Sequence, residues 1–271
     1  MRFLRLGPFF AFGLLLSATT VLAQQSPSLA PPTPTRDGRA VAVLQAAIKA
    51  MGGGVPSDST ATGTVTATVG PESQDGTIQI LTRGTAESLE AISLPNLSQT
   101  TTYFHLMAGQ TNGSTTQQQL SGQLAMTSQT ALYPLPLFVG AMNNPDATLQ
   151  YVGQETVDGA PVNHIRIWNT FASRIYMQPL ATFSVRDVWM NASTGLPAKI
   201  SFTQQAAAGR AFKTLVELDF SNYQQMNGFA YPYVIKKSLN GTPWLTISIQ
   251  SVSFNTGLQY SQFQVNCSNS N

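Results

Sequence analysis

The chain has 271 residues, a formal net charge of +2 and 10% charged residues, where an average soluble protein has about a quarter. Such sparse charge excludes a nucleic-acid-binding surface, because binding to phosphates needs clustered Lys and Arg. After the N-terminal segment, basic residues are adjacent only at Lys236 and Lys237. The single cysteine, Cys267, excludes a disulfide within the chain.

The first residues have the pattern of a secretory signal peptide. Two arginines precede an apolar run that ends near Leu16, and the pattern Val21-Leu22-Ala23 follows, which is typical of a cleavage site. The run is shorter than the roughly 20 residues of a membrane-spanning helix. Gln24 follows the site in place of the cysteine that lipid attachment needs. We therefore predict a signal peptide over residues 1–23 and a soluble, periplasmic protein secreted across the inner membrane.

The rest of the chain divides into a tether, one domain and a tail. Residues 24–35 are polar and rich in proline, which predicts a disordered tether. Residues 36–265 show no shift in composition, and their number suits one mostly-β domain. Residues 266–271 are expected to form a flexible tail.

One amphipathic helix opens the domain. Apolar residues recur at helical spacing, namely Ala40, Leu44, Ala47, Ile48 and Met51. Asp37 is a suitable N-cap, and the glycines at 52–54 are expected to end the helix. Because only one side is apolar, this helix should lie on another layer of the fold.

Alternating apolar and polar residues follow, with strands expected from after Gly54 to about Ser121. The alternation stops between Gln123 and Asn144, the most apolar part of the chain after the signal segment. Pro134 and Pro136 prevent one continuous helix, so we predict a loop leading into a short helix over Pro136–Met142. This segment is either a cover for the core or a movable apolar lid.

The second half of the chain is predicted to be a series of hairpins. Alternating runs are separated by turn signals at Asp158-Gly159, Ser193-Thr194-Gly195, Asn227-Gly228 and Asn240-Gly241. Short turns between consecutive strands produce an antiparallel meander. Val252 and Phe254 are out of step with the preceding apolar residues, which predicts a bulge near Gln250-Ser251. The fold class is α+β, mostly β, with a single curved antiparallel sheet and helices covering one face.

Catalytic motifs are missing from the sequence. No two carboxylates are placed as an acid/base pair, and neither His105 nor His164 has neighbours at metal-ligand spacing. The alternation around His164 predicts a surface histidine. Arg186 shares a strand face with Val188 and Met190; a buried arginine there would suit an anionic head group, but a solvent-exposed one with its stem on the sheet is favoured. We predict no enzyme activity, no cofactor and no metal.

Several hairpins resemble one known family. The stretches "YVGQETVDGAPVNHIRIW", "DVWMNASTGLPAKISF" and "VELDFSNYQQMNGFAYPYVI", with the preceding "LQAAIKAMGG", are similar to the periplasmic lipoprotein-carrier superfamily, which includes LolA/LolB-like and outer-membrane lipoprotein-sorting proteins. The resemblance implies an unclosed β-barrel over residues 36–265, with helices covering its concave face. It also implies an apolar cavity for acyl chains between sheet and helices.

Three functions are weighed on this basis. The favoured one is a non-enzymatic periplasmic carrier or binder of lipids or lipoprotein acyl chains, expected as a monomer. The alternative is an envelope adaptor or sensor domain that binds another protein and has no ligand cavity, and the third is a hydrolase assembled only by the fold. The candidate ligand-binding residues are apolar and aromatic side chains of the sheet and its cover: Leu132, Leu135, Phe138, Trp189, Ile200, Phe202, Phe220, Tyr231 and Trp244.

Overall fold

The computed structural model describes residues 33–113, 117–120, 122–205 and 213–265, all within one compact unit that begins at Pro31. The predicted signal peptide, most of the predicted tether, and the tail with Cys267 lie outside the described residues. At the start of the described chain, the carbonyl of Thr35 accepts a hydrogen bond from the amide of Leu149, and the amide of Asp37 donates to the carbonyl of Leu149. None of the described helices is both long and apolar enough to cross a membrane.

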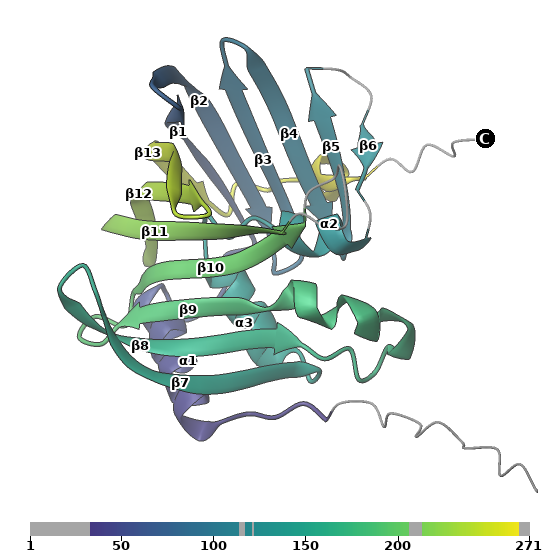
Figure 1. Ribbon diagram of the computed structural model, residues 1–271, viewed down its shortest axis with the longest axis vertical. Helices are drawn as coiled ribbons and strands as arrows, with labels where there is room; N and C mark the ends of the chain where they lie inside the picture. The colour runs from purple at the N-terminus through teal and green to yellow at the C-terminus, as the bar shows by residue number, and fades with distance from the viewer. Residues whose placement is uncertain (1–32, 114–116, 121, 206–212, 266–271) are drawn as a thin grey trace, which may run out of the picture. The chain divides into compact units, whose positions relative to one another are not determined.

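The described strands form one antiparallel sheet in the order β6-β5-β4-β3-β2-β1-β13-β12-β11-β10-β9-β8-β7 (Figure 1). The first wing contains β1 (Asp58–Val69), β2 (Glu72–Arg83), β3 (Glu87–Leu94), β4 (Leu97–Phe104), β5 (Met107–Asn112) and β6 (Gln118–Gln119). The second wing contains β7 (Ala147–Val157), β8 (Ala160–Asn169), β9 (Arg186–Asn191), β10 (Pro197–Gln205), β11 (Lys213–Met226), β12 (Phe229–Leu239) and β13 (Thr242–Phe254). The two wings join where β1 pairs with β13. The sheet therefore has two edges, β6 and β7, and confirms the predicted unclosed antiparallel architecture.

The hairpin turns lie where the sequence predicts them. At Asp158 and Gly159 both φ angles are positive, +50° and +78°, as a two-residue turn with the twist of the flanking strands requires. The Asn-Gly pairs at 227–228 and 240–241 repeat this geometry. Because each turn is so short, neighbouring strands of the second wing pair directly.

The predicted bulge is also confirmed. Where β1 pairs with β13, the register shifts at Gly63 and leaves Gln250 without a partner. The extra residue returns Val252 and Phe254 to the buried side of the sheet, where 6% and 7% of their surfaces are exposed. Without it, both side chains would face solvent.

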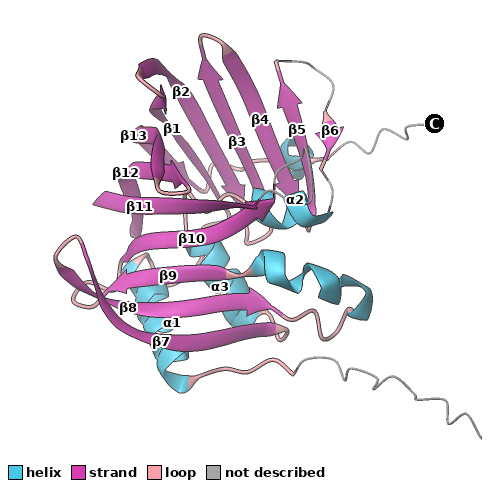
Figure 2. Cartoon of the chain, in the orientation of Figure 1, coloured by secondary structure: helices cyan, strands magenta, loops and turns pink. Residues whose placement is uncertain are grey.

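Helices cover one face of the sheet. Helix α1 (Gly38–Ala50) begins at Asp37, whose carboxylate accepts hydrogen bonds from the amides of Arg39 and Ala40. Helix α3 (Leu135–Asn143) contains the predicted short helix. Helix α1 contacts β7 and β8, α3 contacts β8, and the two helices contact each other (Figure 2). The guanidinium of Arg36 binds carbonyl oxygens at the end of α3, including that of Asn144 at 2.6 Å, and so fastens this helix to the start of the domain.

Three further elements were not predicted. Helix α2 (Gly122–Ser128) falls in the segment expected to be a loop, because its 7 residues are too short to establish a helical period. The 3₁₀ segment η1 (Ile175–Ser184) forms a long excursion between β8 and β9 and contacts α2. A short 3₁₀ turn, η2 (Tyr260–Phe263), follows the last strand.

Candidate ligand cavities beside helix α2

The larger candidate cavity has a volume of about 580 Å³ and lies among α2, α3, the end of β8 and the start of β9. This volume is in the usual range for small-ligand sites. Much of its wall is apolar, with Leu106, Met126, Leu137, Ile167, Trp168 and Phe171. We refer to it as the large cavity.

Arg186 supplies a buried charge to the large cavity. Only 5% of its surface is exposed, so the expectation of a solvent-exposed arginine is wrong. The side chain starts on the covered face of β9, and its guanidinium donates to the carbonyl oxygens of Met126, Phe183 and Val185 at 2.8–3.0 Å. Burial lowers the pKa of Arg186 to about 10, which leaves the group charged at neutral pH.

The second candidate cavity, which we call the small cavity, has a volume of about 340 Å³. It lies between the end of α2 and strands of both wings, with Glu90 and Lys237 among its charged lining residues. The ammonium of Lys237 is 4.9 Å from the ring centre of Trp244. Gln129 lines both cavities, so the end of α2 and the segment after it separate them.

The candidate ligand-binding residues divide into three groups. Leu132, Phe202 and Trp244 line the small cavity. Five others are buried in the main hydrophobic core and line neither cavity: Leu135, Phe138, Ile200, Phe220 and Tyr231. Trp189 lies on the opposite face of β9 from Val188 and Met190. The large cavity was missed because its walls come from α2, η1 and strand ends, and the alternation around Arg186 was the one sequence signal that pointed to it.

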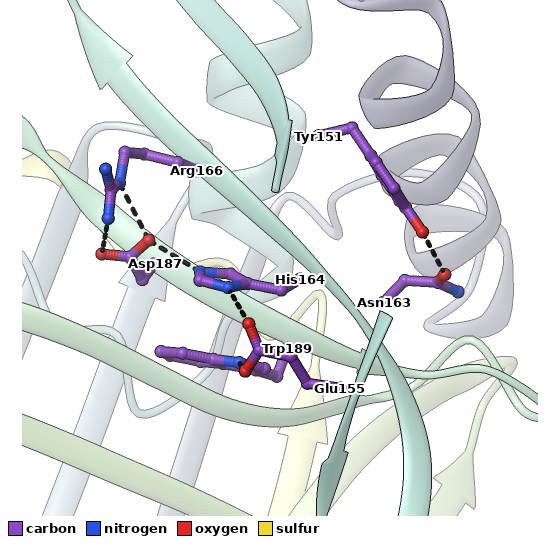
Figure 3. A network of polar contacts seen from close by, with 7 residues as sticks. All are labelled: Tyr151, Glu155, Asn163, His164, Arg166, Asp187 and Trp189. Carbon is purple, nitrogen blue, oxygen red and sulfur yellow. Dashed lines mark hydrogen bonds and ion pairs between the residues drawn. The ribbon is translucent and has the colours of Figure 1, made fainter. Parts of the chain in front are cut away.

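On the outer face of β7–β9, Trp189 belongs to a polar network (Figure 3). Its indole donates to Glu155 at 2.7 Å, and its ring stacks on His164 with centres 4.3 Å apart. Arg166 donates two hydrogen bonds to Asp187. Only 6% of His164 is exposed. The expectation of a surface histidine is therefore wrong, because neighbouring side chains cover its ring.

His164 is poorly placed for general-base catalysis. Its Nδ1 lies 2.6 Å from Glu155 and its Nε2 2.7 Å from Asp187. Each ring nitrogen is therefore already paired with a carboxylate oxygen, and neither is free to contact a substrate. No residue of the network lines the large or small cavity. Within the described ranges, no group of three His, Cys, Asp or Glu is placed to hold a metal ion.

Comparisons with known proteins define the fold. No protein-family profile matches the sequence, and no curated protein does. Among solved structures, a LolA superfamily protein from Nitrosomonas europaea is similar, with a TM-score of 0.55 and 15% identity over 83% of this chain and 97% of that one. An outer-membrane lipoprotein-sorting protein domain from Vibrio parahaemolyticus matches with a TM-score of 0.52 and 13% identity over 76% and 88%. A DUF1329 family protein from Desulfovibrio piger has a TM-score of 0.52 and 12% identity over 83% and 94%.

These similarities place the chain in the class of unclosed β-barrels with a helical cover. More particularly, the chain has a LolA-like fold, which confirms at the level of fold the resemblance seen in its hairpins.

Proposed function

We propose that this protein is a non-enzymatic periplasmic carrier that binds lipids or lipoprotein acyl chains between its sheet and helices. The observation that carries the proposal is the large cavity, about 580 Å³ in volume and with more apolar than polar surface in its wall, in a LolA-like fold. An acyl chain gains free energy by moving from water onto such a wall. The protein acts as a monomer in this proposal and uses no cofactor.

The cavities also bear on the alternatives. An adaptor with no ligand cavity would have side chains filling the interior, whereas two cavities flank the end of α2. A hydrolase would need convergent polar groups in a cleft with one free to accept a proton. The network around His164 lies on the outer face, and both imidazole nitrogens are engaged. The carrier is therefore the function that the geometry supports best.

The three tryptophans offer a test of where a long-chain apolar ligand binds. Trp168 lines the large cavity, Trp244 lines the small cavity, and Trp189 lies on the outer face. Three variants, each retaining one tryptophan and carrying Phe at the other two positions, would be titrated with 11-bromoundecan-1-ol, whose bromine quenches indole fluorescence only at short range. We expect saturable quenching of Trp168 or Trp244 and none of Trp189.

Quenching of Trp189 alone, or of no tryptophan, would contradict the carrier proposal. The variant that retains Trp189 is the matched control, because it reports non-specific adsorption of the alcohol to the outer face. Native mass spectrometry of the full chain taken from its own envelope provides a second readout, in which the carrier proposal expects co-purified lipid.

A further inference from the structure

Arg186 is a buried cation without a carboxylate partner. Buried charges in proteins are normally paired with an opposite charge, yet none of the ion pairs among the described residues includes this arginine. Its hydrogen-bond acceptors are neutral carbonyl oxygens. The phenol of Tyr103 also lines the cavity, but burial raises its pKa to about 12, so it is neutral near pH 7. The ring of Phe202 lies 4.5 Å from Cζ of Arg186 and gives a cation–π contact, but none of these neighbours carries a negative charge.

The guanidinium also retains donors that it can offer to a ligand. Its hydrogen bonds to the carbonyls of Met126, Phe183 and Val185 use three of its five N–H groups. No fourth acceptor is found for it among the described residues, and the side chain lines the large cavity. A carboxylate or phosphate oxygen is the partner that such donors bind most strongly.

The charged residues that line the large cavity carry a net positive charge, as Arg186 itself does. Arg174 and Arg186 both line the large cavity, and Asp146 is the one carboxylate among its lining residues. The carboxylate of Asp146 is already engaged by the amide and hydroxyl of Ser173. Two positive charges and one negative charge give this wall a formal charge of +1, with the histidine counted as neutral.

We propose that the large cavity binds a single-chain amphiphile with a negatively charged head group, a carboxylate or a phosphate monoester. The head group lies against Arg186, and the chain lies along the apolar wall that includes Trp168. This inference rests on the proposed carrier function and specifies its ligand, because a neutral lipid would leave the buried charge uncompensated.

Competition between ligands of one chain length tests the inference. In the variant that retains only Trp168, quenched by 11-bromoundecan-1-ol at pH 8, competing dodecanoate, dodecyl phosphate or dodecan-1-ol would be added until the fluorescence recovers. We expect at least one anionic ligand to act at about tenfold lower concentration than the alcohol, since a hydrogen bond to a charged group is worth that much. Whichever of the two anions acts at the lower concentration identifies the head group.

The same titration would be repeated on two arginine variants. In Arg186→Met the preference for the anion should disappear, and in Arg186→Lys, which keeps the charge, it should be partly retained. Arg166→Met is the matched control, because it removes one positive charge from the outer face, and its preference should equal that of the parent. If Arg186→Met does not fold, the comparison of the anions with the alcohol in the variant that retains only Trp168 still tests whether the large cavity prefers an anionic ligand.

The failures of the two proposals are distinguishable. If the brominated alcohol quenches Trp168 but all three competitors act at the same concentration, the carrier stands and the anionic ligand is refuted. Arg186 then only fastens α2 through the carbonyl of Met126. If Arg166→Met abolishes the preference as fully as Arg186→Met, the inference is likewise overturned. If the alcohol quenches neither Trp168 nor Trp244, the carrier proposal fails and this inference fails with it.

Discussion

Replacing Tyr231 by Phe should stabilise the protein. Tyr231 is fully buried and stacks on Tyr133 with ring centres 4.5 Å apart. Neither hydroxyl has a hydrogen-bond partner among the described residues. Burying an unpaired hydroxyl costs about 1–3 kcal/mol, and Phe keeps the ring and its stacking. We therefore expect a gain of about 1–2 kcal/mol in the free energy of unfolding, or roughly 2–8 °C in melting temperature for a domain of this size.

The measurement is urea-induced unfolding followed by circular dichroism, with thermal melting as a second probe. Tyr223 is the matched control, because its hydroxyl donates to the carbonyl of Pro197 at 2.9 Å. Tyr223→Phe should therefore destabilise the protein by about 1 kcal/mol. If Tyr231→Phe destabilises as much as Tyr223→Phe, the hydroxyl of Tyr231 has a partner, and the reasoning from an unpaired group is wrong.

Two further predictions concern the close approach of β1 to β13 and the carboxylate of Glu155. In Gly63→Ala the new methyl carbon would lie 2.2 Å from a backbone oxygen of β13, so urea unfolding should show a loss of stability of about 2 kcal/mol or more. Gly153→Ala is the control, because its new methyl carbon meets nothing within 4 Å and should change stability by under about 0.5 kcal/mol. Equal losses in the two variants would contradict this prediction. Hydrogen bonds from Trp189 and His164 lower the pKa of Glu155 below its ordinary 4.5, so the ionised carboxylate stabilises the fold above that pH and the contribution is lost as pH falls through the lowered pKa. Urea unfolding should show Glu155→Gln less stable than the parent at pH 6, by up to about 1 kcal/mol for so exposed a group, and the gap should narrow toward pH 3; a gap unchanged by pH would refute it.

The sheet was predictable because its signals are local. A pair such as Asp158-Gly159 dictates a turn through its own backbone preferences, whatever the rest of the chain does. The bulge at Gln250 could be predicted because the apolar alternation shifts by one residue there. An extra unpaired residue is needed to keep the later apolar side chains on the buried face. Helix α1 was equally clear, since its apolar stripe, the Asp37 cap and the following glycines all agree.

The site was less predictable because it depends on contacts between distant segments. Whether Arg186 is exposed or buried depends on α2, which lies some 60 residues earlier in the chain. No sequence pattern near Arg186 predicts that a helix covers it. His164 misled for a similar reason, since the groups that cover it come from β7 and β9. Alternation of apolar and polar residues gives the sheet face on which a side chain lies, but tertiary contacts decide whether that face is exposed to solvent.

The packing of the helices indicates which part of the cover opens most easily. The buried residues of α1 belong to the main hydrophobic core, and so do Leu132 and, in α3, Leu135 and Phe138. This packing favours core cover over a movable lid for the segment from Leu132 to Met142. Of the buried apolar residues of α2, Ala125 belongs to a small separate cluster with Tyr103, and Met126 belongs to neither cluster. A helix with so few buried apolar contacts should open locally at a lower free energy than the core.

Native-state hydrogen exchange can test this difference between the two helices. Amides of α2 should exchange through local opening well before those of α1, and a ligand that fills the large cavity should slow the exchange of α2 most, because Met126 forms part of that cavity's wall. Exchange of both helices only at the global unfolding free energy would show that α2 is as firmly held as the core. The route into the cavity would then have to lie elsewhere, with η1 and the loop before it as the remaining cover.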